Sequence, residues 1–188
     1  MKRMILASGS PRRKELLQML EVPFEVLVSD TKEVITKNEP AEVTKELSYQ
    51  KAMAVAEQVE EGIIIGADTV VSIDGKILGK PADTEEAREM IYKLQGKSHM
   101  VYTGVTVIAK SGDMVSASSF DEGTKVNVAP MTENEIEAYI STDEPYDKAG
   151  AYGIQGLFGK FIEGIKGDYF NVVGLPVHRL YEELKKFD

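Results

Sequence analysis

Residues 62–79 have the sequence GIIIGADTVVSIDGKILG, which predicts one strand over 62–73 and a second over 76–79. Asp74-Gly75 between them is a typical two-residue hairpin turn. This register places Thr69 opposite Lys80 and leaves Asp68 one residue from that pair. Because Asp68 follows the apolar run 63–65, we expect it near a strand end, where α/β folds place their sites.

Strand and helix signals alternate on both sides of this hairpin. Strands are expected at 3–7, 24–28 and 101–107, two more within 114–129, and short ones after a glycine-rich stretch; helices are expected from Ser10-Pro11, over 40–58, from Asp83, over 132–140 and over 176–187. This alternation predicts an α/β fold with a mixed central sheet flanked by helices. Without repeats or linkers, residues 1–188 are expected to form a single domain, with at most two lobes.

Composition excludes several classes of protein. The 188 residues carry 22 Lys and Arg against 31 Asp and Glu, a net charge of −9, which argues against binding to a nucleic-acid polymer. The chain has no cysteine, so disulfides, thiolate metal sites and a cysteine nucleophile are excluded. No apolar run approaches the roughly 20 residues of a membrane span, and no secretory segment is apparent. We therefore expect a cytoplasmic protein without a membrane partner.

The basic residues gather at the start of the chain. Residues 1–14 contain five cations, Lys2 among them, and no acid. Ser8-Gly9-Ser10-Pro11-Arg12-Arg13 follows a strand and opens a helix, so backbone N–H groups, hydroxyls and two guanidiniums can bind a phosphate there. The alternative is a capped helix with solvated cations, although helix N-termini ordinarily favour acids.

Three other positions each allow two interpretations. Asp68, Thr69 and Lys80 together can hold a divalent cation and polarise a phosphate, or Asp68 can simply cap a turn. Lys51 lies on the apolar stripe of the 40–58 helix, where it either extends to solvent or is kept in a cleft by an anionic ligand. Glu33, in a polar loop, is by itself no more than a solvated acid.

A glycine-rich segment follows residue 147. Seven of the 16 glycines lie between 150 and 174, which lets the backbone approach a ligand closely. Within Asp147-Lys148-Ala149-Gly150-Ala151-Tyr152-Gly153-Ile154-Gln155-Gly156, the Gln155 amide suits a base edge and Tyr152 can stack or pack. The two histidines, His99 and His178, are isolated, and His99 is expected to pack or hydrogen-bond beside its strand.

Taken together, these segments resemble the Maf family of nucleoside triphosphate pyrophosphatases over essentially the whole chain. The matching stretches are Leu6–Arg13, Gln50-Lys51-Ala52, Gly66–Thr69, Gly79-Lys80-Pro81, Ser98-His99, Thr103-Gly104, Asp147–Gly156 and Val173–Pro176. The resemblance implies a fold related to inosine triphosphate pyrophosphatases, with a deep cleft, usually as a homodimer. It also implies a divalent-metal reaction, with Mg²⁺ or Mn²⁺, in which water attacks the α-phosphate and releases pyrophosphate.

The same resemblance implies roles for individual residues. Asp68 matches the proton acceptor, and Glu33 with Asp68 matches the acids near the metal, while Lys51 and Lys80 complete the catalytic set. Arg12, Thr69 and Gln155 match the branch acting on dTTP and UTP, and Ser8, Arg13 and Lys148 are further substrate-binding candidates.

The family's biology gives two expectations for the chain. A house-cleaning role on modified pyrimidine nucleotides, with a link to cell-division arrest, is implied by the resemblance. The alternative is a non-catalytic nucleotide-binding regulator of septum formation, since phosphate-binding residues alone do not show turnover.

Overall fold

The computed structural model describes residues 3–28, 30 and 32–187, so the predicted cation Lys2 lies outside the described residues. Its contacts divide the chain into two compact units. The first unit comprises Met1–Asp68, Thr103–Glu122 and Gly174–Asp188, and the second comprises Thr69–Tyr102 and Gly123–Val173. The chain passes between the units within three long strands, β3 (Glu61–Ile73), β5 (Ser98–Ser111) and β6 (Met114–Val128), and once more between Val173 and Gly174.

The strands form the mixed sheet that the sequence predicts. The strand order is β2-β1-β3-β5-β6-β7, with β4 paired to β3. β1 (Met4–Leu6) is parallel to both β2 (Phe24–Val26) and β3, whereas β4 (Lys76–Leu78) is antiparallel to β3 and β7 (Ile162–Lys166) is antiparallel to β6. Parallel and antiparallel pairs in one sheet confirm the mixed α/β class.

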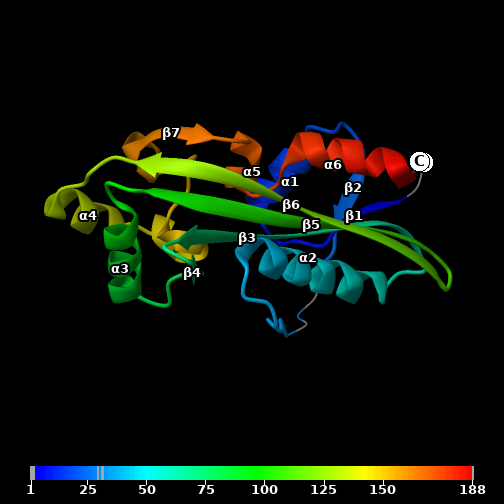
Figure 1. Cartoon of the computed structure of the whole chain (residues 1–188). Helices are drawn as coiled ribbons and strands as arrows, with labels where there is room; N and C mark the ends of the chain where they lie inside the picture. The colour runs from blue at the N-terminus through cyan, green and yellow to red at the C-terminus, as the bar shows by residue number, and fades with distance from the viewer. Residues whose placement is uncertain (1–2, 29, 31, 188) are drawn as a thin grey trace. The chain divides into compact units, whose positions relative to one another are not determined.

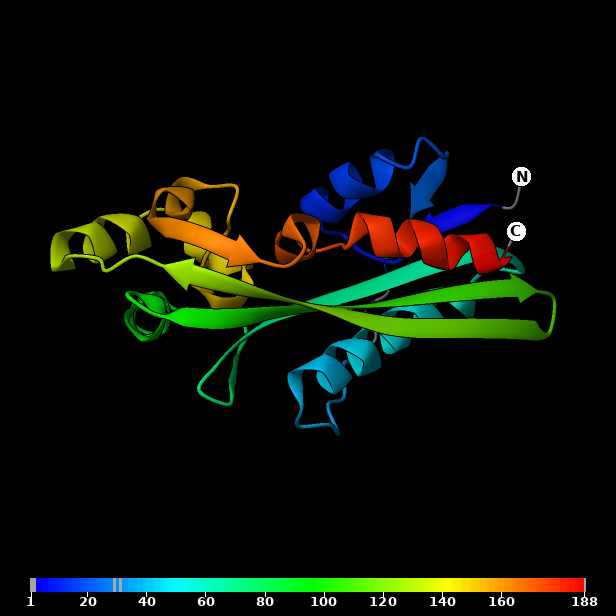
Figure 2. The same ribbon diagram turned by 45° about the horizontal axis from the view of Figure 1, so that its top comes forward.

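In the first unit, helices cover both faces of the strands. Figures 1 and 2 show α2 (Pro40–Ala56) on one face, with α1 (Pro11–Gln18) and α6 (Val177–Leu184) on the other. α1 begins as predicted, because the Ser10 side chain accepts a hydrogen bond from the Arg13 backbone N–H. Buried apolar side chains of β1, α2, β3 and β5 form one core cluster here, among them Ile5, Val55 and Ile64.

The part of α2 that lies on the glycines of the sheet is made of small residues. Thr44, Ser48 and Ala52 are completely buried. A Cβ added to Gly66 of β3 would lie 2.3 Å from the Ser48 carbonyl oxygen, and one added to Gly104 of β5 would lie 2.3 Å from the Thr44 carbonyl carbon. The α2 backbone therefore rests directly on two glycines, a closeness that any side chain at either position would prevent.

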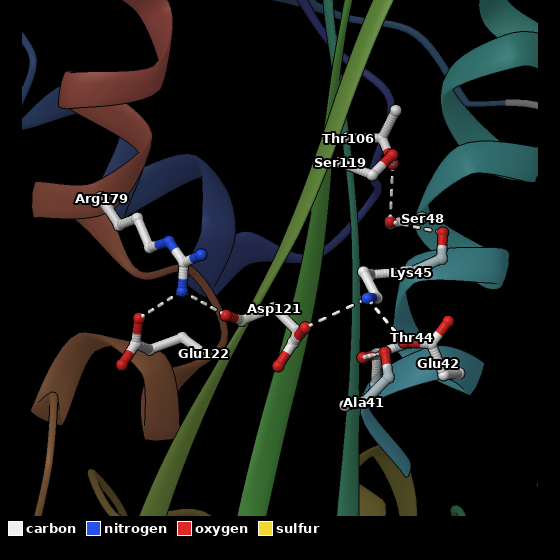
Figure 3. Close-up of polar contacts among 10 residues, drawn as sticks. All are labelled: Ala41, Glu42, Thr44, Lys45, Ser48, Thr106, Ser119, Asp121, Glu122 and Arg179. Carbon is white, nitrogen blue, oxygen red and sulfur yellow. Dashed lines mark hydrogen bonds and ion pairs between the residues drawn. The ribbon is translucent and has the colours of Figure 1, made fainter. Parts of the chain in front are cut away.

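Hydroxyl groups satisfy the polar atoms in this tight contact. The Ser48 and Thr106 hydroxyls lie 2.8 Å apart, and Thr106 is 2.8 Å from the hydroxyl of Ser119 on β6 (Figure 3). At the edge of the same contact, the Lys45 ammonium of α2 is 3.4 Å from the Asp121 carboxylate. Polar side chains of α2 thus contact β5 through Ser48 and β6 through Lys45.

The second unit has its own apolar core. It combines α3 (Thr84–Leu94), α4 (Glu133–Ile140), the distal parts of the long strands and three short 3₁₀ segments, η1 (Glu144–Asp147), η2 (Ala149–Ala151) and η3 (Leu157–Phe161). Tyr152, which directly follows η2, packs on Phe158 with ring centroids 4.7 Å apart. Its hydroxyl is 2.6 Å from Nε2 of the buried His99. Tyr152 therefore packs, and His99 makes the hydrogen bond expected beside its strand.

The structure differs from the predicted elements at several points. The two strands expected within 114–129 are one continuous strand, β6, which is paired with β5 and includes Gly123. Of the short strands expected after the glycine-rich stretch, the structure has one, β7. The 3₁₀ segment η3 precedes it and the helix α5 (Tyr169–Val173) follows it. α2 ends two residues before its predicted end at residue 58, and α6 ends three residues before its predicted end at residue 187. The 3₁₀ segment η4 (Lys185–Phe187) continues α6. Within residues 3–28, 30 and 32–187, no helix combines the length and apolarity needed to cross a membrane.

We expect Gly66→Ala to destabilise the protein. The added methyl group would meet the Ser48 carbonyl oxygen at 2.3 Å and Ala52 at 2.9 Å, so α2 would have to move. Overpacking of this kind costs about 1–3 kcal/mol, which lowers the melting temperature by roughly 3–10 °C at this chain length. Gly164→Ala, at a strand glycine with nothing within 4 Å of the added Cβ, is the matched control. Equal melting temperatures for the two variants would contradict the close contact.

Stability should also fall in mildly acidic solution because of His99. Burial lowers the pKa of His99 to about 4 from the ordinary 6.5, so between these values the unfolded chain binds more protons than the folded one. The free energy of unfolding then decreases as the pH drops from 6.5 to 4, by up to about 3 kcal/mol. Urea unfolding at pH 7 and pH 4.5 measures this difference, which His99→Gln should reduce and His178→Gln, at an exposed position, should not. An unchanged pH dependence in His99→Gln would refute this assignment.

Candidate active site

Three of the predicted site residues form one ionic cluster in the first unit. The Lys51 ammonium of α2 donates a hydrogen bond to Oδ1 of Asp68 on β3. The same nitrogen lies 3.1 Å from Oε1 of Glu33, which belongs to the segment between β2 and α2. Exposure of the side chains rises from 13% for Asp68 through 27% for Lys51 to 47% for Glu33. The cluster therefore lies at the surface of the unit with its aspartate turned inward.

The local fold explains why Lys51 meets Asp68. Alternate residues of a strand face the same side, so Asp68 shares a face of β3 with Gly66, against which α2 packs. Lys51 is one turn beyond Ser48 on α2 and next to Ala52, the two residues that touch Gly66. Lys51 does not simply extend to solvent, because its ammonium is paired with a carboxylate of the chain itself. Its contact with an anionic ligand stays a prediction.

The expected position of Asp68 near a strand end is wrong. β3 continues to Ile73, so Asp68 lies in the middle of a 13-residue strand. The apolar run 63–65 marks only the part of β3 that pairs with the short strand β1. On the other side of β3 lies the long strand β5, so β3 extends beyond the residues that pair with β1. Asp68 therefore belongs to a rigid strand rather than a flexible loop.

The segment at the start of α1 contains a second group of predicted residues. The Arg13 guanidinium donates to the carbonyl oxygen of Gly174 at 2.9 Å and to the Ser8 hydroxyl at 3.2 Å. Burial lowers the pKa of Arg13, and the Asp68 carboxylate opposes that shift. Of the two smaller effects, the Arg12 charge also lowers the pKa and the Glu33 carboxylate raises it. An arginine remains charged under such conditions. Arg13 thus places a partly buried positive charge within electrostatic reach of Asp68, and Arg12 is likewise partly buried in the first helical turn.

The other predicted residues belong to the second unit. The hairpin register is confirmed for Val71 with Leu78, Ser72 with Ile77 and Ile73 with Lys76. β4 ends there, so the ladder does not include the expected pairing of Thr69 with Lys80. The carbonyl of Gly79, directly after β4, accepts a hydrogen bond from the backbone N–H of Gly150 at 2.9 Å.

The glycine-rich segment of this unit contains the last two predicted residues. The Lys148 ammonium donates to the Glu144 carbonyl at 2.8 Å and to the Asp147 carboxylate at 2.6 Å. Gln155 is exposed between η2 and η3. An exposed amide on an irregular segment can reach a ligand without breaking a packed core.

The residues present fit a divalent cation. Within the described residues, no group of three or more His, Asp or Glu side chains is arranged to hold a metal ion. Glu33 and Asp68 nevertheless both contact one ammonium, which shows that their carboxylates approach the same point. Mg²⁺ is commonly bound by one or two carboxylates, with waters and substrate phosphates as the remaining ligands. Two convergent carboxylates are consistent with that mode of binding.

Sequence analysis named Gln50 only as part of the matching stretch Gln50-Lys51-Ala52. It gave this residue no role, although the structure places its amide against the backbone of Val34, next to Glu33. The spacing of Gln50 was the one signal in the sequence that could have indicated a shared role. Gln50 is four residues after Glu46, so both lie on one side of the helix, beside Lys51.

The comparisons with known proteins agree with one another. A family model described as Maf-like protein matches residues 3–187. A dTTP/UTP pyrophosphatase of Bacillus cytotoxicus is 54% identical over 189 residues, with 100% of this chain and 97% of that protein covered. A protein of the same name from Bacillus cereus is 50% identical, with the same coverage.

A solved structure supports the fold class. The Staphylococcus aureus Ham1 protein superposes with a TM-score of 0.55 and 13% identity, with 100% of both chains covered. At this identity the likeness concerns the fold alone. Because the family model spans nearly the whole chain and the relatives match it at 50% identity or more, the chain belongs to the Maf family.

Proposed function

We propose that this protein is a nucleoside triphosphate pyrophosphatase that prefers dTTP and UTP. The observation that carries the proposal is the Glu33–Lys51–Asp68 cluster, which combines an inward carboxylate, an ammonium and a second carboxylate at one place. Membership of the Maf family and relatives named dTTP/UTP pyrophosphatase support it. A protein that only bound nucleotides would need the cations more than this pair of acids.

The reaction is a substitution at the α-phosphorus. The oxygen of a water bonds to the α-phosphorus, and the bond from that phosphorus to the oxygen bridging the α- and β-phosphates breaks. Pyrophosphate leaves with the electron pair of the broken bond, and the nucleoside monophosphate remains. In this scheme Asp68 orients the water and accepts its proton, while its contact with Lys51 fixes the direction of the carboxylate.

Cationic and hydroxyl groups bind the phosphates in this proposal. Arg12, Arg13, Lys51 and Lys80 neutralise the triphosphate, and Ser8 and Lys148 are additional phosphate contacts. Glu33 and Asp68 are the residues that would hold Mg²⁺ or Mn²⁺. When bound, such an ion balances phosphate charge and lowers the pKa of a bound water.

Base selection is assigned to Arg12, Thr69 and Gln155. A glutamine amide offers one donor and one acceptor, which match O4 and N3–H of uracil or thymine. This proposal also includes a single Maf-like domain over residues 1–188, a homodimer, a cytoplasmic location and a link to cell-division arrest. The family resemblance supports all four.

The first test is pyrophosphate release from dTTP, UTP, CTP and GTP with Mg²⁺ or Mn²⁺. We expect preference for dTTP and UTP, and a loss of about 10²–10⁴-fold in kcat for Asp68→Asn, because the amide cannot accept the proton. Asp113→Asn, the same change at an exposed turn, is the control and should keep its activity. Equal background rates for the wild type and Asp68→Asn would favour the non-catalytic regulator.

The second test concerns Gln155. Gln155→Glu replaces the amide donor with a carboxylate, which repels O4 of uracil but can accept from the N4 amino group of cytosine. We expect the ratio of kcat/KM for UTP to that for CTP to fall by about 10-fold, in line with the loss of one hydrogen bond facing a buried partner. Gln58→Glu, at another exposed glutamine, should leave the ratio unchanged. An unchanged ratio in Gln155→Glu would remove Gln155 from base recognition.

A further inference from the structure

Residues 33–36, here called the Glu33 segment, lie against α2 through polar contacts. The side-chain amide of Gln50 donates from Nε2 to the Val34 carbonyl oxygen at 2.7 Å. Its Oε1 accepts from the Val34 backbone N–H at 2.9 Å. Both backbone groups of Val34 are therefore paired with one glutamine, as a neighbouring strand would pair them.

Two further α2 side chains contact the same segment. The Glu46 carboxylate accepts from the Thr36 backbone N–H at 2.9 Å and from the Thr36 hydroxyl. Lys51 contacts the Glu33 carboxylate, as described above. The segment thus runs antiparallel to the helix, with residues 33, 34 and 36 against Lys51, Gln50 and Glu46.

Apolar packing contributes little to this arrangement. Val34 and Ile35 are 55% and 59% exposed, and Glu33 and Thr36 are exposed as well. A segment without buried apolar surface depends on hydrogen bonds for its position. Of the contacts described, the Gln50 amide makes the two that hold the residue next to Glu33.

We propose that Gln50 is a positioning residue that places Glu33 for the reaction. The peptide group joining Glu33 to Val34 is planar and contains the Val34 N–H, so the hydrogen bond to Gln50 fixes the orientation of that group. The Glu33 side chain then starts from a fixed backbone and reaches the point that it shares with Asp68. This inference rests on the proposed function, because it assumes that Glu33 serves pyrophosphate release.

The kinetic test compares Gln50→Ala and Gln50→Glu with the wild type. Both variants lose the donor to the Val34 carbonyl, and the glutamate adds repulsion with that oxygen. We expect kcat for UTP to fall about 10–100-fold, as is usual when a supporting partner of a site carboxylate is lost, with little change in melting temperature. Gln58→Ala is the matched control. Gln58 is also a glutamine whose side-chain amide donates to a backbone carbonyl, but that carbonyl belongs to Ala54 of α2 itself.

A double-mutant cycle with Glu33→Gln shows whether Gln50 acts through Glu33. If it does, Gln50→Ala should reduce kcat much less in the Glu33→Gln background than in the wild type, because the side chain to be positioned is already altered. Equal reductions in both backgrounds would overturn the proposal.

Two measurements do not depend on turnover. Hydrogen exchange at the Val34 amide, followed by NMR, should become at least about 10-fold faster in Gln50→Ala, since the amide loses its acceptor. The affinity for Mn²⁺ without nucleotide should fall about 10-fold or more in Gln50→Ala and stay unchanged in Gln58→Ala. A wild type that binds Mn²⁺ but releases no pyrophosphate would refute the proposed function alone. Unchanged exchange and unchanged Mn²⁺ affinity in Gln50→Ala would refute the positioning role alone.

Discussion

The contact between α2 and Gly66 of β3 is the constraint on which the candidate site depends. The Ser48 carbonyl and Ala52 occupy the space that a side chain at position 66 would need. Asp68 is two residues along the same strand, and Lys51 is next to Ala52 on the helix. A shift of α2 along or away from β3 would therefore separate the Lys51 ammonium from the Asp68 carboxylate. The buried hydroxyls of Ser48 and Thr106 oppose such a shift.

One helix organises groups from three different parts of the chain. Its inner face meets the sheet, Lys51 reaches Asp68, and Gln50 and Glu46 bind the segment that carries Glu33. Strand, helix and loop thus contribute one ionisable group each to the cluster. This arrangement combines a rigid acid on β3 with an acid whose position depends on exposed hydrogen bonds, which are individually weak.

Local patterns predicted much of the fold. The Asp74-Gly75 turn determined the hairpin register, and the capping residues Asp83 and Thr132 marked the starts of α3 and α4. Patterns failed where pairing partners decide the outcome. β6 is one strand because β5 pairs along it. The extent of β3 was predicted correctly, and only the expected position of Asp68 near a strand end was wrong. Propensity within a short window contains no information about the length of a partner strand.

The sequence by itself determined the fold class, the family resemblance and the residue types from which a phosphate and metal site can be built. It also singled out Lys51, Asp68 and Glu33, although it placed Asp68 at a strand end. Only the tertiary structure decided that these three side chains meet, that Arg13 binds Ser8 and Gly174, and that Gln50 contacts the Glu33 segment. The physical reason is that such contacts join residues 16 or more positions apart or depend on the path of a loop, and periodicity describes only neighbours along one element.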